Sequence, residues 1–171
     1  MVYNEHVALG DLSNAESFFR TVKAERECLV TYLRYFEIVD RRLPCEQAAE
    51  CFTKDTNIEY HMKGAPMKFR GRSEYAVFMR KAVAAQEMSA HFVGQTRFVW
   101  TSGAPRLFSY VTSWQWFIAN ADDGDLRPAD FATIGYSEDD FECVEGQWLI
   151  SNRVVKPVAG LTVVGGLISK T

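Results

Sequence analysis

Apolar residues recur at steps of three, four or seven positions along residues 18–36, which is the spacing of one face of an α-helix. Ser13 and Glu16 have the spacing of a capping box, so we expect the helix to begin there. Asp40 is the next residue in line with the apolar stripe. An acid at that position points towards the protein interior, where it is costly unless it is paired. The stripe itself consists of Phe18, Val22, Leu29, Leu33 and Phe36.

The segment after this helix predicts smaller elements. Pro44 suits the first turn of a short second helix that reaches about residue 52, because the missing amide of proline would be unpaired there in any case. Residues 56–62 and 67–70 are predicted as two strands joined by a turn. A third helix is expected over residues 73–87.

Four later segments are rich in β-branched and aromatic residues, and turn-forming or acidic sequences separate them. They span residues 91–101, 107–119, 131–143 and 147–156. Helices followed by long strands predict an α+β fold, with three N-terminal helices packed on one face of a strongly curved, mostly antiparallel sheet. We expect a single domain over residues 1–171, with an N-terminal arm at 1–12 and an apolar C-terminal tail at 158–171.

Composition narrows the classes of function. With 47% hydrophobic and 13% aromatic residues, the chain has enough apolar material for a core and an enclosed cavity. The net charge of -3 and the absence of a Lys/Arg cluster argue against a nucleic-acid partner. The four cysteines lack metal-ligand spacing, so we expect no metal site. The N-terminus resembles no signal peptide and no apolar stretch could span a bilayer, so we expect no membrane association and a cytoplasmic location.

One histidine is the main candidate for chemistry. His91 opens the run His91-Phe92-Val93-Gly94-Gln95-Thr96-Arg97-Phe98, and no further histidine follows it. This run resembles the strand that carries the catalytic histidine in scytalone dehydratases. Three other segments resemble the same family in the same order, and the order of elements is similar to the cone-shaped α+β barrel of the NTF2-like, SnoaL-like proteins. The three segments are Tyr35 through Asp40, Asn57-Ile58-Glu59-Tyr60, and Gly146-Gln147-Trp148-Leu149-Ile150 with Arg153.

The resemblance, which covers roughly residues 14–157, implies an Asp40-His91 dyad that needs no metal or cofactor. Asp40 would fix the tautomer of the imidazole, and His91 would remove a proton from a carbon next to a carbonyl. By the same resemblance, Tyr35 and Tyr60 would donate phenolic hydrogen bonds to a carbonyl or leaving oxygen, and Arg153 would bind a carboxylate or enolate oxygen. Relatives with such a tail associate, which implies a homo-oligomer, a trimer first and a dimer second.

The sequence departs from scytalone dehydratases at one position. The second catalytic histidine of that family would fall near Trp116 or Phe117, where this chain has none. This disfavours scytalone as a substrate and favours an apolar ligand stacked on Trp114 or Trp116. Phe36 and Tyr110 are expected to complete the cavity wall.

Three hypotheses therefore remain open. The first is a cofactor-independent lyase (dehydratase) or isomerase acting on a small apolar, polycyclic polyketide-like or steroid-like molecule. The second is a non-catalytic NTF2-like ligand-binding or assembly module. The third is an aldol-type polyketide cyclase or an epoxide hydrolase, in which Asp40 and not His91 would be the primary acid or base.

Overall fold

The computed structural model describes residues 15–61, 65–121 and 127–161, and these form three α-helices and the strands of one sheet, with two strands between the second and third helices. The predicted arm at residues 1–12 lies outside the described residues, as does the tail from residue 162. The elements are α1 (Ala15–Asp40), α2 (Cys45–Ala49), β1 (Phe52–Tyr60), β2 (Met67–Arg70), α3 (Arg72–Ala84), β3 (Gln86–Thr101), β4 (Ala104–Phe117), a short 3-10 turn (Ile118–Asn120), β5 (Phe131–Val144) and β6 (Gln147–Leu161).

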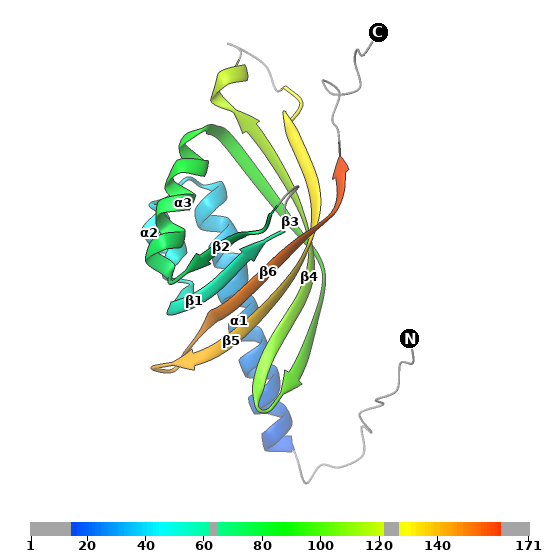
Figure 1. Ribbon diagram of the computed structural model, residues 1–171. Coiled ribbons are helices and arrows are strands. Elements are labelled where there is room, and N and C mark those ends of the chain that lie inside the picture. Colours follow the sequence, from blue (N-terminus) through cyan, green and yellow to red (C-terminus); the bar gives the residue numbers. More distant parts are fainter. Residues whose placement is uncertain (1–14, 62–64, 122–126, 162–171) are drawn as a thin grey trace.

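The six described strands form one sheet in the order β2-β1-β6-β5-β4-β3, so β2 and β3 lie at its two edges. Four of the five neighbouring pairs are antiparallel, and β1 runs parallel to β6. Figure 1 shows a twisted sheet with α2 and α3 beside its β1–β2 end and α1 running along the strands. The predicted fold class, α+β with N-terminal helices and a mostly antiparallel sheet, is confirmed.

Several predicted element boundaries were wrong, among them the end of the third helix, which is Ala84, and the start of β3, which is Gln86. β1 begins at Phe52, several residues before the predicted start, because α2 ends at Ala49 and Phe52 is fully buried opposite Ile150 of β6. β6 continues through residues 158–161, which pair with β5, so the predicted tail begins as part of the sheet.

The hairpins follow the turn chemistry of the sequence. Ser102 and Gly103 join β3 to β4 with positive φ angles of 52° and 81°, and Glu145 and Gly146 join β5 to β6 with 51° and 80°. Two successive residues with positive φ suit the right-handed twist of the flanking strands. These short connections fix which residues face one another across β3 and β4, and therefore which side chains meet on the inner face of the sheet.

The predicted apolar stripe of α1 is only partly its buried face, since Leu29 and Phe36 pack against the core and the rest of the stripe does not. Phe18, Val22 and Leu33 are exposed. The buried residues are Ala24, Cys28, Tyr32, Tyr35 and Ile38, which also follow helical spacing but lie on a different side of α1. In Figure 1 the first turns of α1 extend beyond the β5–β6 turn to the level of the β3–β4 turn, so the early apolar residues of the helix lie at the end of the sheet.

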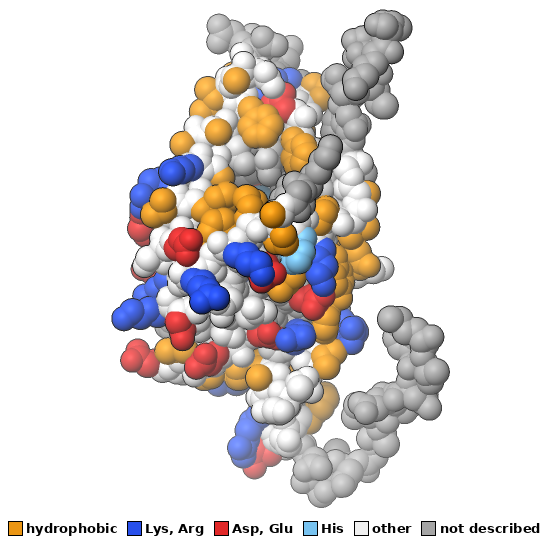
Figure 2. Space-filling view, in the orientation of Figure 1, with side chains coloured by type: hydrophobic (Ala, Val, Ile, Leu, Met, Phe, Trp, Pro, Cys, Tyr) orange, Lys and Arg blue, Asp and Glu red, His pale blue; other side chains and the backbone are white. Residues whose placement is uncertain are grey.

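Charge and apolar surface are unevenly distributed. On the face seen in Figure 2, hydrophobic side chains gather in the upper half, and charged side chains of both signs dominate the lower half. In the same orientation, the upper half contains the end of β4 and the start of β5. These strand ends supply part of the wall of an internal pocket.

Candidate functional site

A pocket of about 250 Å³ lies between α1, α3 and the inner face of the sheet. Most of its lining is aromatic or aliphatic, and a few polar side chains converge on it. Of the residues predicted for the site, the pocket brings together Tyr35, Phe36, Tyr60, His91 and Arg153. An enclosed apolar pocket with few polar groups is the usual form of a small-molecule site.

Asp40, the last residue of α1, is tied to His91 of β3 by two hydrogen bonds. The carboxylate Oδ1 lies 2.6 Å from the imidazole Nδ1, and Oδ2 accepts from the His91 backbone N–H at 2.8 Å. Ser89 Oγ donates to the same Oδ1 at 2.9 Å. Burial alone would raise the pKa of Asp40, but these hydrogen bonds and the charge interaction with His91 outweigh it and hold the pKa below its usual value.

The hydrogen bonds of His91 assign its tautomer. Because a carboxylate only accepts, Nδ1 carries the proton and the neutral ring keeps a lone pair on Nε2. Ser113 Oγ, on the facing strand β4, lies 3.1 Å from that nitrogen. The ring of Phe36 lies 4.8 Å from the imidazole, centroid to centroid, and limits its rotation.

Three tyrosine hydroxyls form a chain along the pocket. Tyr75 of α3 lies between the other two, with its hydroxyl 2.5 Å from that of Tyr35 and 2.6 Å from that of Tyr60. Three O–H groups sharing two hydrogen bonds leave one proton unused, which is available to a ligand oxygen. Burial raises the pKa of both Tyr35 and Tyr75, so both phenols stay protonated at neutral pH.

Arg153 lines the pocket, but its charge is already compensated. Its Nε donates to Asp139 Oδ1 at 2.5 Å, and both side chains are almost completely buried. The guanidinium carbon lies 4.5 Å from the centre of the Tyr35 ring. Within the described residues, Arg153 Nη2 has no hydrogen-bond partner. Arg153 therefore places positive charge beneath the tyrosine chain while one N–H group remains unused.

Tyr110, Trp114 and Trp116, which were expected to bind the ligand, do not line this pocket. His91 pairs with Ser113 across β3 and β4, and both line the pocket. Because side chains alternate along a strand, the even-numbered neighbours of Ser113 face the other side of the sheet. Tyr110 is substantially exposed there beside Tyr136, and the Trp116 indole donates to the Arg127 carbonyl.

Sequence reasoning missed several polar residues of the site, among them Tyr75, Ser113, Gln115 and Asp139. Tyr75 lies within the predicted third helix, where nothing in the sequence marks it as part of a site. The alternation of side chains along β4 could have identified Ser113 and Gln115. It requires only that His91 be placed on the inner face and that the β3–β4 turn be known. Asp139 pairs directly with Arg153 across β5 and β6, and a buried arginine requires such a partner.

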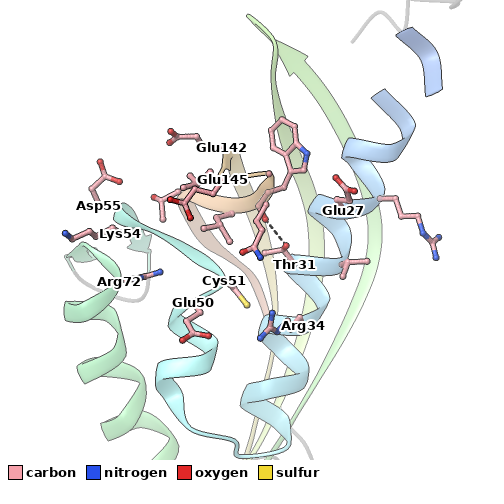
Figure 3. Close-up of a pocket in the computed structure, with 18 of the residues that line it drawn as sticks. Glu27, Thr31, Arg34, Glu50, Cys51, Lys54, Asp55, Arg72, Glu142 and Glu145 are labelled. Carbon is pink, nitrogen blue, oxygen red and sulfur yellow. Dashed lines mark hydrogen bonds between the residues drawn. The ribbon is translucent and has the colours of Figure 1, made fainter. Parts of the chain in front are cut away.

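A second, larger groove lies on the other side of α1, against β1 and the β5–β6 turn (Figure 3). Figure 3 shows charged side chains of both signs along it, among them Glu27, Arg34, Glu50 and Arg72. It does not contain Asp40 or His91. The smaller pocket is the better candidate because its polar groups converge on one enclosed space.

Comparison with known proteins places the chain in a family. Residues 20–154 match the model of the SnoaL-like domain, and the chain belongs to this family. A search of curated proteins found no match.

Solved structures with the same fold include three bacterial proteins. One, from Novosphingobium aromaticivorans DSM 12444, is provisionally named a scytalone dehydratase; it is 17% identical with a TM-score of 0.70, over 84% of this chain and 90% of that one. An NTF2-like protein with a cystatin-like fold from N. aromaticivorans is 16% identical with a TM-score of 0.67, over 95% and 99%. A provisionally named dehydratase of the NTF2-like family from Streptomyces avermitilis is 12% identical with a TM-score of 0.65, over 80% and 97%. At these identities the similarity establishes the NTF2-like fold.

No helix among the described residues is long and apolar enough to cross a membrane. The described part of the chain also holds no cluster of three or more His, Cys, Asp or Glu side chains suited to a metal ion.

Proposed function

We propose that the chain is a cofactor-independent lyase of the dehydratase type, or an isomerase, that removes a proton from a carbon next to a carbonyl of a small cyclic ligand. The observation that carries the proposal is the orientation of His91. Its Nδ1 is held by Asp40 at 2.6 Å, and the ring lines an apolar pocket, where Ser113 Oγ lies 3.1 Å from Nε2. A neutral imidazole oriented by a buried carboxylate is a general base, and such a base typically contributes about 10² to 10⁴ in rate.

The other polar groups of the pocket support the same chemistry. Removing the proton places negative charge on the carbonyl oxygen of the ligand. The unused proton of the tyrosine chain and the buried charge of Arg153 both stabilise such an oxygen. The imidazolium formed at His91, stabilised by Asp40, then returns its proton to a departing hydroxyl in a dehydration or to another carbon in an isomerisation.

The size of the pocket limits the ligand. About 250 Å³ lies below the usual range for ligand sites, which is roughly 300 to 1000 Å³. We therefore expect a molecule of one or two rings, and we expect steroid-like molecules with four rings to bind poorly. The names of the dehydratases with the same fold favour elimination of water over isomerisation.

The test is incorporation of deuterium from D₂O into a panel of one-ring and two-ring hydroxylated ketones, followed by NMR. We expect exchange or loss of water with the wild type, and loss of both in His91→Ala and Asp40→Asn. His61→Ala is the matched control, because that histidine contacts Glu59 and does not line the pocket. Binding without exchange, equal in wild type and variants, would contradict the proposal and favour a ligand-binding module.

A further inference from the structure

The His91-Asp40 dyad is extended by a hydrogen-bond chain through Ser113 and Gln115, and the proposed proton abstraction does not use these two residues. Gln115 Nε2 donates to Ser113 Oγ at 3.4 Å, Ser113 Oγ lies 3.1 Å from His91 Nε2, and His91 Nδ1 lies 2.6 Å from Asp40 Oδ1. All four side chains are partly buried. This is the connectivity of a nucleophile, a base and an orienting acid.

The direction of this chain follows from the chemistry of its ends. The Asp40 carboxylate can only accept, so the proton between it and His91 belongs to Nδ1. His91 Nε2 then carries a lone pair, and Ser113 is the donor to it. The Ser113 hydroxyl proton therefore already points at the base that would remove it, and the amide of Gln115 donates to the Ser113 oxygen.

The fold holds these groups rigidly. Ser113 lies directly opposite His91 on β3 and opposite Thr133 on β5, so β4 is paired on both sides at this point. Facing residues on one side of a sheet bring their side chains into contact. Ser113 also lines the apolar pocket, so a ligand that enters the pocket reaches its hydroxyl.

We propose that Ser113 is a nucleophile activated by His91 and Asp40, and that the pocket accepts small apolar carboxylic esters and transfers their acyl group to Ser113. The inference uses the geometry of the dyad and does not depend on the proposed lyase or isomerase reaction.

The reaction proceeds in two balanced halves. Ser113 Oγ forms a bond to the ester carbonyl carbon as its proton passes to His91 Nε2, and the carbonyl π electrons move to the carbonyl oxygen. The tetrahedral intermediate then expels the alkoxide, which takes the proton from His91 and leaves as an alcohol. In the second half, His91 removes a proton from water as the water attacks the acyl-Ser113. The acid is released and Ser113 Oγ recovers its proton.

The hydrogen-bond donors near Ser113 limit the expected rate of acyl transfer. Gln115 Nε2 donates to the attacking oxygen, Ser113 Oγ, at 3.4 Å, and it would stabilise the oxyanion of the intermediate only after turning to the carbonyl oxygen. In the described part of the chain, Gln115 is the one side chain that donates to Ser113. Because one oxyanion-hole donor is typically worth about 10² to 10³ in rate, we expect slow turnover and stable adducts, which suits detection by mass spectrometry.

The experiment is labelling of the full chain with an alkyl fluorophosphonate, followed by peptide mass spectrometry. In this reaction the Ser113 Oγ–P bond forms, fluoride leaves and the hydroxyl proton passes to His91. We expect an adduct on Ser113 in the wild type, no adduct in Ser113→Ala, and at least 100-fold slower labelling in His91→Gln and Asp40→Asn. Ser151→Ala is the matched control, because Ser151 bonds the Asp140 carbonyl and does not line the pocket. Circular dichroism verifies that each variant is folded.

Two results would overturn the inference. One is a folded wild type that gives no adduct on Ser113. The other is an adduct that forms as fast in His91→Gln as in the wild type, which would mean that the dyad does not activate the hydroxyl. Labelling requires no lyase substrate, so its failure beside successful deuterium exchange removes only this inference. Successful labelling without exchange removes only the lyase proposal.

Discussion

Asp40 contacts His91 at two points, through the ring at Nδ1 and through the backbone N–H, and so connects the C-terminal end of α1 to β3. The two residues are 51 positions apart in the chain. Arg42, just beyond the helix, strengthens the same junction because its guanidinium donates to the carbonyls of Gln86 and Glu87 at the start of β3. The base of the site is therefore oriented by the packing of a helix end on an edge strand.

The lowered pKa of Asp40 predicts a specific dependence of stability on pH. A carboxyl group whose pKa is lower in the folded state stabilises the fold above its unfolded pKa, about 3.9, and loses this contribution as the pH falls through the folded value. His91 is the ionisable group that faces it. We expect urea unfolding to show wild type more stable than Asp40→Asn near pH 6, with the difference shrinking below about pH 4. A difference that stays constant across this range would contradict the assignment.

The buried pair Arg153 and Asp139 predicts a large effect of breaking it. Asp139→Asn leaves the guanidinium charge of Arg153 buried without a compensating charge. Such a change typically lowers the free energy of unfolding by about 3 to 5 kcal/mol. The matched control is Asp140→Asn, the next residue along β5, whose partner Arg106 is solvent-exposed; we expect at most about 1 kcal/mol there. Chemical denaturation measures both. Equal costs for the two substitutions would show that the buried pair does not carry the expected charge.

The tyrosine chain predicts unequal effects of removing its hydroxyls. Tyr75→Phe leaves the buried hydroxyl of Tyr35 without a partner, which costs about 1 to 3 kcal/mol. Tyr60→Phe should cost less, because the Tyr35–Tyr75 bond remains and Tyr60 is only partly buried. Thermal unfolding of the two variants tests the order. A larger cost for Tyr60→Phe would contradict the arrangement.

The homo-oligomer implied by the family resemblance remains a proposal. The side of the sheet that faces away from the pocket exposes Phe92 and Tyr110, and contact with further copies of the chain would cover them. We expect sedimentation to give the mass of a trimer, or failing that a dimer, and Tyr110→Glu to shift it towards the monomer. A monomeric wild type would contradict this proposal.

The order of helical and strand patterns was enough to predict the fold class, since such patterns extend over many residues. The pairing of Asp40 with His91 was implied by the family resemblance, and periodicity placed only Asp40 on the helix. The wall of the pocket was harder to predict, because a change of one position in β4 exchanges Ser113 for Trp114 on the inner face. The sequence offered conspicuous tryptophans, whereas the fold uses a serine and a glutamine. Tyr75 could not be linked to Tyr35 from the sequence, because their contact joins segments 40 residues apart.

The most direct test of the central claim is chemical rescue of proton abstraction. His91→Ala removes the imidazole and leaves space beside Asp40, and imidazole added to the solution can occupy that space. The test uses a ketone whose proton the wild type exchanges in D₂O. We predict that His91→Ala lowers the rate of exchange by a factor of about 10² to 10⁴. Added imidazole should restore part of this rate in proportion to its concentration. Exchange by His91→Ala at the wild-type rate would contradict the assignment of His91 as the base.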